Sequence, residues 1–299
     1  MVKPYALSIA LAILATTNAA NAQTASDRGP LFFTLEGLYA YQADTDLEDD
    51  GSFSVDRTYL GAGIAYRFND SSILAISMSA GRLDYDFDMA GSVPWGTIET
   101  TSLSVFFRTR SERISWLVAP TLRFTSEKGA KRSDGETYGL FAGASWILSD
   151  RLRIGPAFGV FSELEGGGAT AFPAVLVDWD ITDQWNLSTS SAIGASRGPG
   201  LSLTYAPNDT LRLGLTGRLE ETRFRLNAEG PVPGGIGEDR SFPLVVSLGY
   251  EPGPWASVNA FAGVELGGRL RLEDAAGQLV SQQEYDPAPI FGVQARLAF

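Results

Sequence analysis

Two side-chain types that carry much of protein chemistry are missing from this chain of 299 residues, which has no cysteine and no histidine. Without cysteine there is no disulfide, no thiolate nucleophile and no lipid anchor on a cysteine. Without histidine there is no usual general base near neutral pH, and the commonest metal ligand is absent. A Ser-His-Asp hydrolase is excluded. We therefore expect a protein that is not an enzyme and that uses no cofactor.

Positive charge is also scarce. The only lysines are Lys3, Lys128 and Lys131, so arginine supplies nearly all the cations, and the net charge is −12. A nucleic-acid-binding surface needs a concentrated basic patch. We therefore expect no nucleic-acid partner.

Long apolar runs are few. The clearest is Ala6–Ala15, which follows Lys3 and precedes the small-x-small triplet Ala20-Asn21-Ala22. A positive region, an apolar core and a cleavage pattern in this order are typical of a signal peptide, although a buried helix of a soluble domain is the alternative. We predict a signal peptide over residues 1–22 and a single domain over residues 23–299. No later segment reaches the roughly 18 apolar residues that a membrane-spanning helix needs.

Beyond Pro30 the hydrophobic pattern repeats every two residues. Alternate positions are apolar in Ile114–Phe124, Tyr138–Leu148 and Val258–Leu266, and the positions between them are small or polar. Successive side chains of a strand point to opposite faces, so each run predicts a strand with one apolar face. The pattern indicates an all-β protein.

Short and long connections alternate between the expected strands. The short ones fall near residues 69–72, 111–113, 149–150, 182–184, 207–210 and 252–254, and the longer ones are polar or glycine-rich. This alternation is typical of a transmembrane antiparallel up-and-down β-barrel. Counting strands between the connections gives 14 strands, with 12 as the alternative because Ala169–Asp180 and Leu201–Ala206 are weak segments.

Tryptophan placement favours a membrane barrel over a soluble β-sandwich. Indole rings prefer the bilayer–water interface, whereas the core of a sandwich would place them in mid-strand. Five tryptophans lie within a few residues of an expected short turn and form a predicted interfacial girdle: Trp116, Trp146, Trp179, Trp185 and Trp255. Trp95 is the exception and lies in an expected long loop.

The last strand alternates to the end of the chain through Phe291, Val293, Ala295, Leu297 and Phe299. This pattern resembles the terminal signal read by the outer-membrane barrel assembly machinery. The whole mature chain also resembles an uncharacterised family of bacterial outer-membrane β-barrel proteins. The resemblance implies the bacterial outer membrane as the location, with membrane lipid, lipopolysaccharide and the assembly machinery as partners. It carries no functional residues to transfer.

Charged residues occur in mid-strand on the faces opposite the apolar ones. Hydrocarbon exposure of an arginine costs about 2–4 kcal/mol near mid-depth, so in a barrel these residues must face the lumen. The predicted lumen-lining arginines are Arg151, Arg153, Arg212, Arg218, Arg269, Arg271 and Arg296, facing Glu36, Glu163 and Glu265. A ring of arginines favours anions, but an internal arginine–carboxylate network that blocks the pore fits the same residues.

Two further features carry expectations. The acidic segment Asp44–Gly51 is an expected external loop whose oxygens suit Ca²⁺, but it lacks the full EF-hand pattern and a solvated loop explains it as well. Four prolines fall inside expected strands, where a closed barrel offers no free edge, so we expect bulges or strand ends there: Pro120, Pro156, Pro173 and Pro243.

The function that these observations favour is a porin-like passive channel for small solutes. The alternative is a closed structural or surface-interaction barrel with functional external loops. Both place the chemistry in the lumen and loops, because the strands themselves serve to pair every backbone group within the bilayer.

Overall fold

The computed structural model describes residues 30–49, 51–165, 167–189 and 200–299. This part of the chain is almost entirely β-strand, which confirms the predicted fold class. Its helical content is one 3₁₀ turn, η3 (Arg132–Gly135). Within these ranges no helix is long and apolar enough to cross a membrane. The predicted signal peptide lies outside the described residues.

Sixteen strand segments follow one another along the chain. They are β1 (Leu31–Asp46), β2 (Ser52–Asn69), β3 (Ser72–Asp88), β4 (Thr97–Arg110), β5 (Ile114–Glu127), β6 (Glu136–Ser149), β7 (Leu152–Ser162), β8 (Ala169–Asp180), β9 (Trp185–Ser188), β10 (Gly200–Tyr205), β11 (Leu211–Arg218), β12 (Glu220–Arg225), β13 (Ile236–Gly253), β14 (Ala256–Glu273), β15 (Leu279–Tyr285) and β16 (Ala288–Ala298).

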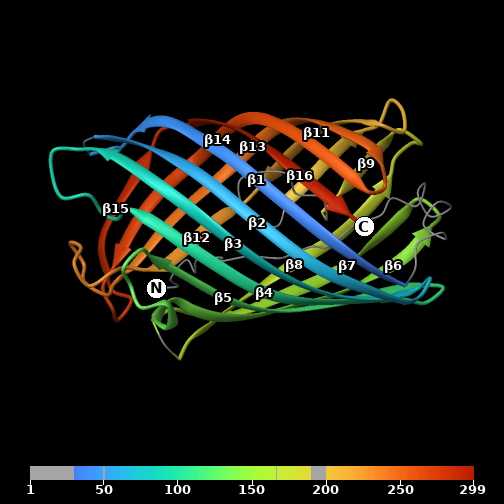
Figure 1. The fold of residues 1–299 in the computed structure, drawn as a ribbon, viewed down its shortest axis with the longest axis horizontal. Helices are drawn as coiled ribbons and strands as arrows, with labels where there is room; N and C mark the ends of the chain where they lie inside the picture. Colours follow the sequence, from blue (N-terminus) through green and yellow to red (C-terminus); the bar gives the residue numbers. More distant parts are fainter. Residues whose placement is uncertain (1–29, 50, 166, 190–199) are drawn as a thin grey trace.

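These segments build a closed barrel of 14 strands, as the sequence predicts. Segments β11 and β12 pair with successive parts of β13, so together they make one wall strand. In the same way β15 and β16 pair with successive parts of β14. The pairings of β13 with β14 and of β1 with β16 complete the ring, whose strands run obliquely to its long axis (Figure 1).

The two ends of the barrel differ. At the short-turn end, tight connections join β2 to β3, β4 to β5, β6 to β7 and β13 to β14, and the barrel begins and finishes there at Leu31 and Ala298. At the long-loop end lie the connections between β1 and β2, β3 and β4, β5 and β6, and β12 and β13. The predicted alternation of short and long connections is therefore present.

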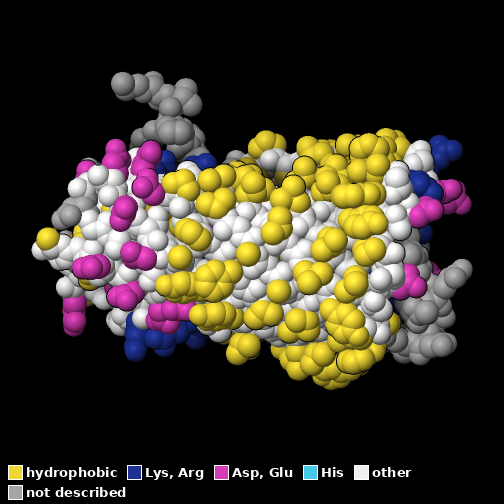
Figure 2. All heavy atoms as spheres, turned by 90° about the horizontal axis from the view of Figure 1, so that it is seen from above, with side chains coloured by type: hydrophobic (Ala, Val, Ile, Leu, Met, Phe, Trp, Pro, Cys, Tyr) yellow, Lys and Arg dark blue, Asp and Glu magenta, His cyan; other side chains and the backbone are white. Residues whose placement is uncertain are grey.

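Large apolar side chains cover the outer face of the wall. Leu60, Met78, Val175 and Val246 are each more than half exposed, and all sit at strand positions whose sequence neighbours are less exposed. Figure 2 shows hydrophobic side chains spread over the middle of the face in view, while acidic side chains gather at the long-loop end. Exposed apolar area on this scale is typical of a lipid-facing surface.

The long-loop end is narrower than the rest. Arg225 at the end of β12 pairs with Ser126 of β5, although five wall strands lie between the β11/β12 strand and β5 in the sheet order. The Leu164 carbonyl, just after β7, accepts a hydrogen bond from Arg225 at this junction. The barrel therefore tapers from the short-turn end to the long-loop end.

Three of the four strand prolines lie where the ladder is interrupted on one side. The β4–β5 ladder lacks partners for Ala119 and Pro120, and the β6–β7 ladder lacks them for Gly155 and Pro156. Pro243 lies opposite the break between β11 and β12. Pro173 is paired with Phe158 of β7. At Pro120, Pro156 and Pro243 the missing N–H therefore accompanies a local gap in the ladder, whereas the sequence suggested a bulge or a strand end.

Candidate functional site

The lumen is the candidate site, and small residues line most of its short-turn half. On β2 the inward positions Gly61, Gly63 and Ala65 alternate with exposed Leu60, Ala62 and Ile64. The facing strands continue this lining with Ser77 and Ser79 on β3, Ser102 and Ser104 on β4, and Gly155, Ala157 and Gly159 on β7. Barrels of about 8 strands are just filled by side chains, whereas about 16–18 strands leave an aqueous channel. Part of this half is packed, because inward apolar side chains of β2 to β8 form a buried cluster that includes Phe106, Phe141 and Phe172.

Several inward aromatic rings lie flat on the wall. Each covers a glycine directly opposite on the neighbouring strand: Tyr59 on Gly81, Phe161 on Gly139, Phe172 on Gly159, Phe224 on Gly237, Phe261 on Gly292 and Tyr285 on Gly268. A Cβ added to Gly159 would lie 2.1 Å from Phe172 Cζ, so only glycine leaves room for the ring. The rings are held against the wall and do not reach across the lumen.

A charged network crosses the lumen where the barrel narrows. Arg57 on β2 makes an ion pair with Glu265 on β14, with one hydrogen bond from NH1 to Oε1 and another of 3.2 Å from NH2 to Oε2. Arg57 NH2 also donates to Gln42 Oε1 at 2.7 Å. Arg57 is 3 % exposed, and Glu265 and Gln42 are fully buried. We call these three residues and Asp239 the Arg57 layer.

Asp239 on β13 completes the Arg57 layer. Its Oδ2 lies 3.8 Å from Arg57 NH2 and accepts a 2.8 Å hydrogen bond from the Tyr85 hydroxyl. Its Oδ1 accepts a 3.1 Å bond from the Tyr285 hydroxyl. The layer therefore ties together side chains from six neighbouring wall segments and narrows the lumen at this level.

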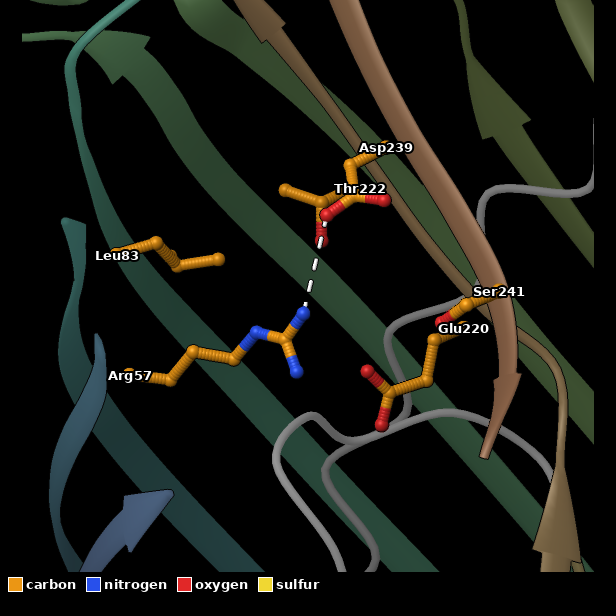
Figure 3. Close-up of a pocket in the computed structure, with 6 residues that line it drawn as sticks. All are labelled: Arg57, Leu83, Glu220, Thr222, Asp239 and Ser241. Atoms are coloured by element: carbon orange, nitrogen blue, oxygen red, sulfur yellow. Dashed lines mark ion pairs between the residues drawn. The ribbon is translucent and has the colours of Figure 1, made fainter. Parts of the chain in front are cut away.

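A small hollow of about 10 Å³, enough for about one water molecule, adjoins the layer (Figure 3). It is lined by Arg57, Leu83, Glu220, Thr222, Asp239 and Ser241. In the close-up the Arg57 guanidinium projects between the carboxylates of Asp239 and Glu220, which come from β13 and β12. The space beside the layer is polar on most sides.

Two further arginines lie near Tyr59 at this level. Arg218 on β11 is 2 % exposed and donates from NH2 to Glu220 Oε1. Its Nε and NH1 have no hydrogen-bond partner, and neither does NH2 of Arg123 on β5. Tyr59 has Arg57, Arg123 and Arg218 as electrostatic neighbours. The middle of the lumen therefore contains guanidinium donors that the protein itself leaves unused.

An apolar cluster fills the lumen on the long-loop side of the Arg57 layer. It includes Phe53, Tyr85, Trp95, Ile98 and Phe224, and it continues through Leu226, Leu270, Leu272 and Tyr285. Trp95 belongs to the β3–β4 connection but is only 2 % exposed, and its ring meets Phe224 edge-on at 5.0 Å. The expected external loop therefore turns inward and packs into the end of the barrel.

The predicted lumen arginines separate into three groups: some point into the lumen, one lies at the short-turn end, and two lie on the outer face. Arg153, Arg212, Arg218 and Arg296 occupy inward positions, with Arg153 2.8 Å from Asp178 and Arg212 3.4 Å from Glu251. Arg151 lies at the short-turn end, more than half exposed, and pairs with Asp183. Of the predicted acidic partners, Glu36 is opposite Arg296 in the β1–β16 register, and Glu163 accepts a bond from Thr170.

Arg269 and Arg271 point away from the lumen. Their neighbours Leu270 and Leu272 belong to the interior apolar cluster, so alternation places the two arginines on the outer face of β14. There they pair with Glu238 at 3.1 Å and Glu273 at 2.7 Å. The reason is a register shift in β14 beside Gly267, whose φ of 58° admits one extra residue and reverses the faces beyond it.

The predicted girdle and terminal strand occupy the outer surface. The five girdle tryptophans are between 40 % and 54 % exposed and lie in or beside strand ends at the short-turn end. On β16, Phe291, Val293 and Leu297 are exposed, while Phe299 stacks on Phe33 at 6.0 Å. These positions are compatible with contact to lipid.

Sequence reasoning placed Glu265 among the inward charges but missed that it forms one network with Arg57, Gln42, Asp239, Tyr85 and Tyr285. Partners that lie 208 residues apart, as Arg57 and Glu265 do, cannot be read from local patterning. Among the described residues no group of three or more acidic side chains is arranged to hold a metal ion.

Comparison with known proteins shows which fold the chain shares. No protein-family model matches the sequence, and no curated protein does. A FadL homologue from Pseudomonas aeruginosa aligns over 96 % of both chains with a TM-score of 0.51 and 13 % identity. The toluene transporter TodX of P. putida aligns over 95 % of both, with a TM-score of 0.48 and 8 % identity. An outer membrane channel from Pseudomonas putida F1 covers 92 % of this chain and 98 % of its own, with a TM-score of 0.45 and 12 % identity. The first likeness shows that this chain shares the fold of an outer-membrane β-barrel.

Proposed function

We propose that this protein is a passive channel for small solutes in the bacterial outer membrane, with the Arg57 layer as its constriction. The observation that carries the proposal is the change in lining along the axis. Small residues line much of the short-turn half on β2, β3, β4 and β7, and a charged layer joins six wall segments beyond them. In the outer membrane, the short-turn end of such a channel faces the periplasm and the long-loop end faces the outside of the cell.

The constriction has features of a gate that can open. Its closing contacts are side-chain ion pairs and hydrogen bonds, which can exchange without breaking the wall ladder. Glu220 on the far side of the small hollow provides a further carboxylate near the Arg57 guanidinium (Figure 3).

A second candidate function is a closed structural barrel that acts through its external loops. The observation that favours it is the apolar cluster around Trp95 and Phe224, which packs the lumen beyond the Arg57 layer. In that case the Arg57 layer braces the wall and passes no solute. The two functions differ in one measurable quantity, the ion conductance of the folded protein.

Conductance in a planar bilayer tests the proposal. The refolded protein is compared with an Arg57→Ala/Glu265→Ala double variant, which removes both members of the buried ion pair and so leaves neither charge without its partner. We expect discrete steps for the unmodified protein and larger steps for the double variant. The control is Arg82→Ala/Asp84→Ala, which removes an exposed ion pair from the outer face.

The outcome separates the two functions. Larger steps in the double variant, with the control unchanged, support the Arg57 layer as the constriction. Silence from all three proteins, each shown to be folded by its heat-modifiable migration in gels, refutes the channel and favours the closed barrel. Equal steps in all three place the constriction elsewhere.

A further inference from the structure

We propose that the lumen holds a binding site for a small oxyanion, a carboxylate or a phosphate, beside Tyr59 and between Arg123 and Arg218. The site deepens the channel proposal, because it assigns a substrate class to the same lumen. It is distinct from the Arg57 layer, in which the Arg57 guanidinium is paired with Glu265, Gln42 and Asp239.

The first observation is that Arg218 keeps unused donors although it is buried. Its NH2 is occupied by Glu220, but Nε and NH1 have no partner, and the side chain is 2 % exposed. A buried donor without an acceptor costs about 1–3 kcal/mol, and more when it is charged. An acceptor that enters from the lumen would remove this cost.

The second observation is that Arg123 keeps an unpaired donor beside hydroxyls that bond to one another. Its neighbours along β5 are Thr121 and Thr125, whose hydroxyls bond across the strands to Ser104 at 3.1 Å and to Thr100 at 3.0 Å. Its partner across the β4–β5 ladder, Ser102, is bonded to Ser79 at 2.7 Å. These hydroxyls are paired with one another, and Arg123 NH2 is left without a partner.

The third observation is that the nearby carboxylates are already engaged. Glu265 and Asp239 accept bonds from Arg57, Tyr85 and Tyr285, and Glu220 accepts one from Arg218. A mobile anion near Tyr59 therefore meets guanidinium donors that the resident carboxylates leave unused. The planar guanidinium group matches the geometry of carboxylate and phosphate oxygens, which selects oxyanions over halides.

The strand ladders place Arg123 on the short-turn side of the Arg57 layer. Arg123 sits on the inward face of β5 and is only partly buried, so it borders the lumen. Through the ladders it is in line with Ser102, Ser79 and Gly61, which are small inward residues. The Tyr59 ring is held against the wall over Gly81, and both arginines act electrostatically on its hydroxyl. An anion would therefore approach the site from the small-residue half of the lumen.

Equilibrium binding tests the site without requiring conduction. Sodium phosphate and sodium acetate are titrated separately into the folded mature protein in detergent micelles, with ionic strength held constant by sodium chloride, and binding is followed by calorimetry. We expect saturable binding of one or both anions. Arg123→Gln and Arg218→Gln should each weaken it by about tenfold or more, the loss of one charge-assisted hydrogen bond.

Two variants make the test specific. Arg123→Lys keeps the charge but loses the planar donor pair, so it should retain part of the affinity. Arg82→Gln on the outer face should bind like the unmodified protein. Absence of saturable binding, or equal binding by all variants that show heat-modifiable migration, overturns the site. Binding by a protein that never conducts refutes the channel and keeps the site, whereas conduction without binding does the reverse.

Discussion

The energetics of the Arg57 layer are decided by single side chains. Arg57, Glu265 and Asp239 are all less than 10 % exposed, so each charge depends on its partners for solvation. The carboxylates of Glu265 and Asp239 share the Arg57 guanidinium. The hydroxyls of Tyr85 and Tyr285 both donate hydrogen bonds to Asp239 and so stabilise its charge. The layer is stable as a set, and removing one member leaves another without its partner.

Replacing Arg57 alone should therefore be strongly destabilising. We expect Arg57→Met to lower the free energy of unfolding by about 3–5 kcal/mol, because it leaves buried carboxylates without a cation. Unfolding by urea in micelles, followed by tryptophan fluorescence, measures the change. The double variant Arg57→Met/Glu265→Gln should lose less than the single variant, and a strictly additive loss would show that the two side chains do not act together.

Glycines that lie beneath aromatic rings give a second prediction about single residues. In Gly159→Ala the new Cβ would lie 2.1 Å from Phe172 Cζ, so the ring must leave the wall. Overpacking of this kind costs about 1–3 kcal/mol, and we expect a loss of that size in the same unfolding measurement. Gly91→Ala is the matched control, since a Cβ there has no atom within 4 Å. Equal stability of the two variants would count against a requirement for glycine under the ring.

At the scale of the strand, much of the fold could be predicted from the sequence. Alternation depends only on which face meets lipid, so β5, β6 and β14 could be read directly from their residues. The faces of Arg269 and Arg271 could not, because they depend on an extra residue beside Gly267 that does not disturb the apolar pattern. The Arg57 layer was equally hidden, since its partners come from distant strands.

The girdle tryptophans yield a prediction about whole strand ends. If the short-turn end lies at the bilayer interface, lipids brominated near the glycerol should quench Trp116, Trp146, Trp179, Trp185 and Trp255. Trp95 should be protected, because it is buried inside the opposite end. Variants that retain one tryptophan each, reconstituted into brominated vesicles, measure this. Strong quenching of Trp95, or none of Trp116, would contradict the proposed orientation.

For the whole molecule, the outer surface determines where the protein can reside. The apolar outer face of the wall would be unstable in water, and the acidic long-loop end would be unstable in hydrocarbon (Figure 2). When the full chain is produced in a Gram-negative host, we expect it to remain with the outer-membrane fraction after alkaline carbonate extraction. Quantitative release into the supernatant would refute an integral barrel. A periplasmic soluble protein from the same cells is the control for complete extraction.

The terminal residue adds a prediction about assembly. Phe299 is largely exposed and stacks on Phe33 where the first and last strands meet. Deleting Phe299 should lower the fraction of heat-modifiable barrel in the membrane, while the same chain still refolds in detergent without the assembly machinery. Unchanged assembly in cells would show that this residue is not read as a signal. Phe291→Ala, on the same face of β16, tests whether the effect belongs to the terminus.

The seam of the barrel constrains the order of events in biosynthesis. The first strand pairs with the last, from Thr34 opposite Ala298 to Gln42 opposite Ile290. A chain that emerges from its N-terminus cannot close this seam until its final residues arrive. Until then it carries two unpaired edges, which are templates for pairing with other chains. Any chaperone that binds the nascent chain at these edges must therefore recognise a surface that is no longer exposed in the finished barrel. Closure of the seam between the first and last strands can then release the chaperone.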